Sequence, residues 1–289
     1  MNRLAAAVVL AFAPAAGFAV SQESPLARFS SQVQLVEVYA TVNDTAGALV
    51  TGLHREDFEV YENNQLQEVS AFVAGEFPLT VALGVDRSWS MAGDRLRLAK
   101  QASQAFLRAL KPADRSMVVA ISSEAEVIAP LEMDRLNQTR AIEALDPWST
   151  TALHDAIIAT LDRLGPEPGR QALVVFSDGA DRYSRATAAE VVERARRSNA
   201  LMYPIAFGKM RSPLLAELAV LTGGRSYLLR DVRELDKTLA QIARELRYQY
   251  LLGYAPSRPI ESDRREWRSI RVVVKKPGIR VRARDGYMT

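Results

Sequence analysis

The pattern of hydrophobic and polar positions divides the chain into three regions. Between 33 and 72, β-branched and aromatic residues predict three strands separated by turns rich in Asn, Asp and Gly. From 77 to 247, short apolar runs alternate with stretches in which apolar residues recur at helical spacing. The last region, 248–289, returns to strand-like patterns around a polar loop.

The middle region has the rhythm of a parallel α/β sheet. Continuous apolar runs are typical of strands that are covered on both faces. The predicted strands are 79–85, 117–121, 172–176, 201–206 and 226–229, and the predicted helices are 94–110, 151–164, 187–198, 213–221 and 232–247. We therefore expect a doubly wound, mainly parallel, Rossmann-like sheet with helices on both faces.

The two flanking regions are each too short to fold alone. Because a few isolated strands are only marginally stable in water, we expect segments 31–76 and 248–289 to pair with each other. The α/β domain, 77–247, would then be inserted into one small β domain. The pattern of the first flank predicts no helix.

The N-terminus predicts export. A positive start at Met1–Arg3 precedes an apolar run over 4–16, and Gly17 and Ala19 are small residues of the kind that signal peptidase reads. We expect residues 1–19 to be a cleaved signal peptide, with an uncleaved anchor as the alternative. No later segment approaches the length needed to span a bilayer. The mature protein is therefore expected in the periplasm, on the cell surface or in the medium.

Composition and charge exclude several functions. The chain has no Cys and two His, which excludes thiol catalysis and Cys-ligated zinc and argues against a multi-His metal site. The net charge is +3, and basic residues accumulate after residue 263. The stretches 271–275 and 280–284 are typical of strands whose charged residues face solvent, so we expect no nucleic-acid partner.

Oxygen-bearing side chains follow the predicted strands of the α/β domain. Asp86, Ser88 and Ser90 come after the first strand, Thr151 precedes a helix, and Asp178 follows a later strand. On an extended segment the first three side chains point the same way. Ligands of open α/β sheets bind at the carboxyl ends of the strands. Carboxylates and hydroxyls without nitrogen or sulfur favour Mg²⁺, and also Mn²⁺ or Ca²⁺.

Each of these positions also has a purely structural interpretation. Ser88 and Ser90 could cap the following helix, and Thr151 could be a helix N-cap. Asp178 with the following glycine could be an ordinary turn. Thr150 competes with Thr151 for the ligand role, although the spacing to the helix favours Thr151.

The five residues resemble, in order and placement, the metal-ion-dependent adhesion site of the von Willebrand factor A family. The resemblance covers 77–247, including the phrases 151–156 and 177–179, and the flanks look like those of exported bacterial members. It implies that Ser88 and Ser90 bind the ion directly, Asp86 and Asp178 mainly hold its waters, and Thr151 binds directly or through water.

The resemblance also implies a function. A vacant position on the ion would accept a Glu or Asp carboxylate of a partner protein, so we expect an exported, metal-dependent adhesion or interaction module. Two departures from the family pattern stand out: Trp89 replaces a glycine between the serines, and Ser149-Thr150 replaces a pair of glycines. Trp89 either contacts the partner or packs beneath a neighbouring loop.

Enzyme function has little support in the sequence. No Gly-x-Ser-x-Gly, phosphate-loop or dinucleotide motif is present. A Ser–His–Asp arrangement would need His154 to face the strand ends. We expect no enzyme; a hydrolase that uses the bound cation and a metal-free scaffold are the alternatives.

Overall fold

The central sheet is built from the apolar runs of the middle region. The computed structural model describes residues 35–207, 211–229, 235–260 and 265–289, so the expected signal peptide lies outside the described residues. The strands are β5 (Leu79–Asp86), β6 (Arg115–Ile121), β7 (Ala125–Glu132), β8 (Arg170–Ser177), β9 (Leu201–Phe207) and β10 (Tyr227–Leu229). Their order is β10-β9-β8-β5-β6-β7, and within this sheet only β7 runs antiparallel to its neighbour.

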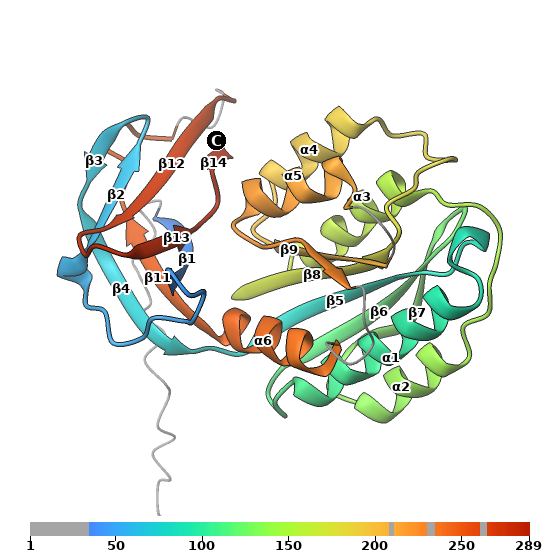
Figure 1. The fold of residues 1–289 in the computed structure, drawn as a ribbon. Helices are drawn as coiled ribbons and strands as arrows, with labels where there is room; N and C mark the ends of the chain where they lie inside the picture. The colour runs from blue at the N-terminus through green and yellow to red at the C-terminus, as the bar shows by residue number, and fades with distance from the viewer. Residues whose placement is uncertain (1–34, 208–210, 230–234, 261–264) are drawn as a thin grey trace, which may run out of the picture. The chain divides into compact units, whose positions relative to one another are not determined.

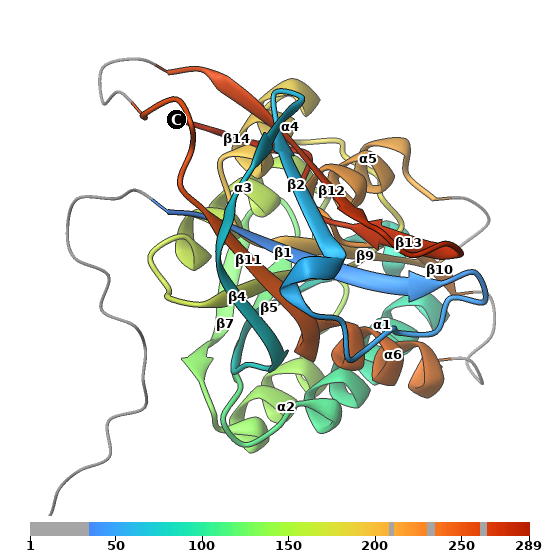
Figure 2. The ribbon, with the colours of Figure 1, turned by 90° about the vertical axis from the view of Figure 1, so that its left-hand side faces the viewer.

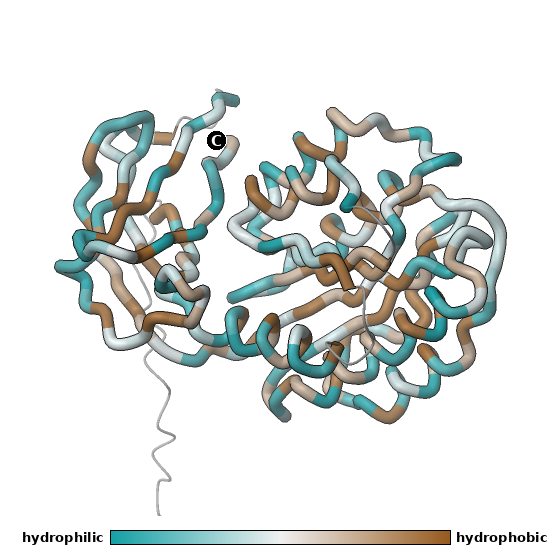
Figure 3. The backbone as a smooth tube through the Cα atoms, in the orientation of Figure 1, coloured by the Kyte–Doolittle hydropathy of each residue, from teal (hydrophilic) through white to brown (hydrophobic). Residues whose placement is uncertain are grey.

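Helices cover both faces of this sheet (Figure 1). One face carries α1 (Asp94–Ala109), α2 (Arg135–Glu143) and α6 (Leu235–Arg247), and the other carries α3 (Leu153–Leu164), α4 (Ala188–Arg196) and α5 (Pro213–Thr222). Alternate residues of β5 enter opposite cores: Val81 belongs to the core that includes α1 and α6, and Ala82 to the core that includes α3 and α5. Every residue of β5 and β8 is buried, and hydrophobic stretches follow the central strands in Figure 3.

Strands from both flanks form two further sheets (Figure 2). The first has the order β13-β1-β11-β4, and the second has the order β14-β12-β2-β3. These strands are β1 (Val36–Asp44), β2 (Phe58–Glu62), β3 (Gln65–Gln67), β4 (Val69–Glu76), β11 (Tyr248–Tyr254), β12 (Trp267–Val274), β13 (Ile279–Arg282) and β14 (Gly286–Met288). The two sheets share one hydrophobic core. The expected fold class is confirmed, while the expected domain boundaries stay a prediction.

A buried polar network links the two flanks. Glu62 of β2 accepts hydrogen bonds from the hydroxyls of Tyr254 and Tyr287, each at 2.8 Å, and its other oxygen lies 3.2 Å from Nη1 of Arg268. Burial, followed by the hydrogen bond to Glu62, raises the pKa of both tyrosines. The carboxylate is thereby satisfied by three C-terminal side chains, as a buried charge requires.

Arg170, at the start of β8, is a second buried polar residue that connects separate elements. Its Nη1 donates to the carbonyls of Leu246 and Arg247, the last residues of α6, the second at 2.7 Å. The guanidinium lies over the rings of Tyr39 and Phe77, 5.2 and 4.8 Å from their centroids. Burial lowers the Arg170 pKa to about 10. Because α6 leads directly into β11, this arginine satisfies the helix end where the chain changes from helix to strand.

Several elements differ from the sequence prediction, and three of them show why. β7 and α2 lie where no element is predicted: β7 is an edge strand that tolerates Pro130, and α2 is mostly polar, so neither has a clear hydrophobic period. The first flank, expected to contain no helix, has one 3₁₀ turn at Arg55–Asp57. The Asp57 carboxylate accepts a hydrogen bond from the amide of His54, the N-cap, at 2.9 Å, and hydrophobic periodicity does not report a local bond of this kind.

Candidate metal centre

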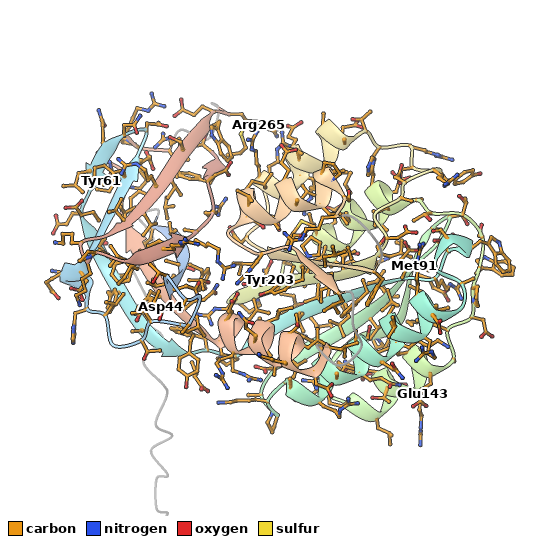
Figure 4. The ribbon with its side chains drawn as sticks, viewed as in Figure 1. Asp44, Tyr61, Met91, Glu143, Tyr203 and Arg265 are labelled. Atoms are coloured by element: carbon orange, nitrogen blue, oxygen red, sulfur yellow. The ribbon has the colours of Figure 1, made fainter. Side chains whose placement is uncertain are left out.

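The carboxyl end of β5 lies where the order of the strands reverses. β5 has β8 on one side and β6 on the other, so the loops that follow β5 and β8 leave the sheet next to each other. Met91, fully buried after β5, marks this edge in Figure 4. The five candidate residues all belong to loops or strand ends at this edge.

Asp86 ends β5 and has no exposed surface. Its Oδ1 accepts a hydrogen bond from the amide of Ser88 at 2.9 Å, and its Oδ2 accepts one from the hydroxyl of Ser177 at 2.6 Å. Both donors are neutral, and no described residue forms an ion pair with Asp86. Burial raises the pKa of this carboxyl, the hydrogen bonds lower it, and the charge of Asp178 raises it further.

The two serines after Asp86 do not cap α1. Ser88 precedes a 3₁₀ turn, η2 (Trp89–Met91), without a capping bond from its side chain, and the N-cap of α1 is Gly93. The hydroxyl oxygens of Ser88 and Ser90 lie 3.1 Å apart. Because the amide of Ser88 is bonded to Asp86, the two hydroxyls stand beside a buried carboxylate.

Thr151 is buried just before α3, and it does not cap that helix either. The N-cap position is Ala152, and its side chain makes no cap bond. The first two helix amides, of Leu153 and His154, donate instead to Oδ1 of Asp181 at 2.7 and 3.2 Å. Asp181 belongs to the loop after β8. Because Asp181 caps the helix, the Thr151 hydroxyl takes no part in the capping bonds.

The loop before Thr151 is held against the loop that carries the serines. The carbonyl of Ser149 accepts from the amide of Trp89 at 3.1 Å, and the amide of Trp148 donates to the carbonyl of Arg87 at 2.7 Å. Ser149 has a φ of 58°, in the left-handed region that favours glycine. This is a position where the family resemblance leads one to expect glycine. Thr150 is only half-buried.

Asp178 follows β8 and accepts hydrogen bonds through both oxygens. Oδ1 accepts a hydrogen bond from the amide of Ala180 at 3.1 Å, and Oδ2 accepts one from Nη1 of Arg95 at 3.2 Å. The same Arg95 nitrogen donates to the carbonyl of Ser90 at 3.0 Å. Arg95 therefore joins the loop after β8 to the loop after β5, and it gives Asp178 a cationic partner of a kind that Asp86 lacks.

Gly179 lets this loop pass close to α5. Its φ is 80°, and a Cβ at this position would lie 2.4 Å from the Cβ of Ser212, the N-cap of α5. A side chain would have to displace either the Asp178 loop or the helix. The turn predicted at 178–179 therefore lies where this loop passes close to the start of α5.

The donor set fits a hard divalent cation. The five residues offer two carboxylates and three hydroxyls, which are oxygen ligands of the kind that Mg²⁺, Mn²⁺ and Ca²⁺ prefer. In the described part of the chain, no group of three or more Asp, Glu, His or Cys side chains could hold a metal ion. A cation at this edge would therefore depend on the hydroxyls as well as the carboxylates.

His154 is used to position the loop after β8. Its Nδ1 lies 2.9 Å from the carbonyl of Ala186 and 3.6 Å from Oδ2 of Asp181. The neighbouring Asp155 accepts from the amides of Arg185 and Ala186, each at 2.9 Å. No described serine hydroxyl bonds to His154, so these side chains do not assemble a Ser–His–Asp arrangement.

The fold agrees with what comparison with known proteins finds. The model of the von Willebrand factor type A domain family matches residues 81–180, a stretch that contains all five candidate residues. The chain contains a von Willebrand factor type A domain. No curated protein matches the chain.

Solved structures resemble the A domain at low sequence identity. A von Willebrand factor type A protein from Catenulispora acidiphila is 16% identical over 90% of this chain and 75% of its own, with a TM-score of 0.53. An aerotolerance-related membrane protein from Bacteroides fragilis NCTC 9343 is 16% identical over 58% of this chain and 99% of its own, with a TM-score of 0.50. The von Willebrand domain of the type V pilus tip protein Mfa5 from Porphyromonas gingivalis is 12% identical over 58% of this chain and 95% of its own, with a TM-score of 0.50. These likenesses show the fold.

Several residues that shape the site are missed by sequence reasoning. Arg95 and Asp181 act across loops, and Asp181 bonds to an amide 28 residues away in the chain. Single polar residues of this kind have no periodic signal. Trp148 and Tyr183 are also missed, although a search for aromatic residues near the five candidates would have found both.

Proposed function

We propose that the A domain binds one divalent cation at the carboxyl edge of its sheet and uses it to bind a Glu or Asp side chain of a partner protein. The observation that carries this proposal is Asp86, a fully buried carboxylate whose hydrogen-bond donors are neutral. A buried charge without a counter-charge costs several kcal/mol, and a cation would offset that cost.

In this proposal Ser88, Ser90 and Thr151 supply neutral oxygens, and Asp86 and Asp178 supply negative charge. When bound, the ion contributes positive charge and a coordination position that a carboxylate can fill. The amide of Ser88 orients Asp86, so the carboxylate stays in place before the ion arrives.

We place this function outside the cytoplasm, on the basis of the apolar N-terminus. No helix in the described ranges is long and apolar enough to cross a membrane. Two similar structures belong to a membrane protein and a pilus tip protein, which is compatible with an envelope role. The intact mass of protein from the periplasm or medium should lack residues 1–19, and a full-length cytoplasmic protein would contradict export.

Binding is favoured over catalysis because His154 is engaged by a backbone carbonyl and by Asp181. A cation-assisted hydrolase would need a free general base at this edge. Turnover of generic ester or phosphate substrates that depends on Mg²⁺ would overturn this choice. A metal-free scaffold would show no Mg²⁺ binding at all.

Calorimetric titration with Mg²⁺ and Mn²⁺ tests the site. Asp86→Ala should abolish ion binding while the circular dichroism spectrum stays that of the wild type. Asp94→Ala is a matched control, because the Asp94 side chain is 86% exposed and, among the described residues, pairs only with Arg97 on the surface of α1. The proposal fails if Asp86→Ala binds either ion as tightly as the wild type.

The two neighbouring threonines separate ion binding from partner binding. Thr151→Ala should weaken capture of the partner from an envelope extract more than it weakens Mg²⁺ binding. Thr150→Ala should change neither. Capture is scored as the fraction released by EDTA, and equal effects of the two variants would remove the assignment of Thr151.

A further inference from the structure

Three large aromatic side chains face solvent around the candidate metal centre. Trp89 is 65% exposed, Trp148 is 59% exposed and Tyr183 is 64% exposed. They come from the three loops that carry the candidate ligands, after β5, before α3 and after β8. We refer to these three residues as the aromatic rim. Because Trp89 is this exposed, it does not pack beneath a neighbouring loop.

Backbone hydrogen bonds hold the aromatic rim in place. The amide of Trp89 is bonded to Ser149, and the amide of Tyr183 donates to the carbonyl of Thr151 at 3.0 Å. The two bonds connect Trp89 to Tyr183 through Ser149 and Thr151, which are two residues apart. With about 3.8 Å between consecutive Cα atoms, Trp89 and Tyr183 therefore lie within roughly 20 Å of each other. That distance fits within a single protein–protein interface of standard size, roughly 800 Å² on each partner.

The composition of this surface is that of an interface centre. Trp, Tyr and Arg dominate the binding energy of protein interfaces, and Arg182, next to Tyr183, is exposed and forms no ion pair with any described residue. Its amide also donates to the carbonyl of Thr151, at 2.9 Å. Other exposed large hydrophobic residues lie outside these three loops, such as Leu66 on β3 and Val220 in the last turn of α5. Apolar surface gathered in this way marks an interaction site.

We infer that the aromatic rim selects a protein segment in which the metal-bound Glu or Asp is flanked by apolar or aromatic residues. This inference rests on the proposed function, because the carboxylate is taken to reach the cation. The charge of the partner residue is recognised at the centre, and Trp89, Trp148 and Tyr183 cover its neighbours. Arg182 adds a place for a second carboxylate or a partner carbonyl.

A displayed peptide library tests this preference on the full chain. The library has a central Glu with four random residues on each side, and a matched library has Gln at the centre. Peptides are selected in Mg²⁺ and eluted with EDTA from the wild type, from a Trp89→Ala/Trp148→Ala double variant, and from Val220→Ala. Val220 is 74% exposed on α5, so this control removes an exposed apolar side chain elsewhere. Mg²⁺ affinity is measured separately for each protein.

The wild type should enrich Phe, Trp, Leu and Pro within two positions of Glu. The best peptide should bind the double variant at least tenfold more weakly, with Mg²⁺ affinity and the Val220→Ala result unchanged. EDTA-eluted peptides without apolar enrichment would overturn the rim inference alone. Equal yields from the Glu and Gln libraries would overturn the proposed function itself. Mg²⁺-dependent binding of polygalacturonate in place of peptides, lost in the double variant, would identify an acidic glycan and overturn the protein partner.

Discussion

Removing the positive charge of Arg95 should increase metal affinity. Its Nη1 lies 3.2 Å from Oδ2 of Asp178 and 3.0 Å from the carbonyl of Ser90, two residues assigned to the proposed site. The guanidinium and the cation would therefore share the negative charge of one carboxylate. In Arg95→Gln the carboxylate keeps a polar neighbour but loses the competing charge.

The size of the effect follows from Coulomb's law. For unit and double positive charges about 6 Å apart in a dielectric near 80, the repulsion is about 1.4 kcal/mol. The Arg95 side chain is 47% exposed, so solvent and salt reduce this value. We expect a gain of about 0.7 to 1.4 kcal/mol, which is a three- to tenfold lower Kd for Mg²⁺.

Calorimetry at low ionic strength measures this change, and two variants control it. Arg95→Lys keeps the charge and should bind Mg²⁺ within about twofold of the wild type. Arg97→Gln removes an equal charge from the same helix, where Arg97 pairs with Asp94 at 2.9 Å, and should have no effect. Weaker Mg²⁺ binding by Arg95→Gln would refute the reasoning, since Arg95 would then organise Asp178 for the ion. An equal gain in Mg²⁺ affinity in Arg97→Gln would mean that the effect comes from the net charge of the protein and not from the position of Arg95.

Two further predictions concern stability. Asp181→Ala leaves the first amides of α3 without their acceptor. The free energy of unfolding should fall by about 1–2 kcal/mol, which lowers the melting temperature by roughly 2–8 °C in a thermal unfolding experiment. An unchanged melting temperature would mean that another group caps the helix. Burial raises the pKa of Tyr203 from 10.0 to about 12, so between pH 10 and 12 the folded protein keeps a proton that the unfolded chain loses, and stability falls as pH rises. Denaturant titrations should therefore show Tyr203→Phe losing about 1.4 kcal/mol less per pH unit than the wild type in this range, and parallel pH profiles would contradict the assignment.

The central strands and the order of the site residues can be predicted from the sequence because both depend on local pattern. A strand covered on both faces is mainly apolar, so the middles of β5 and β8 appear as continuous apolar runs. In parallel strands the carboxyl ends meet at one edge, so Asp86 and Asp178 can be placed together before any contact is known.

The surroundings of the site depend on tertiary structure. Whether Thr151 caps its helix is decided by Asp181, which reaches α3 from another loop. Likewise, the charge balance at Asp178 depends on Arg95, 83 residues away in the chain. These are contacts of single polar side chains, and periodicity carries information only about which face of an element is buried. The sequence alone determined which oxygen atoms could meet at the sheet edge. Tertiary packing decided which of them are already paired, because that depends on how separate loops approach one another.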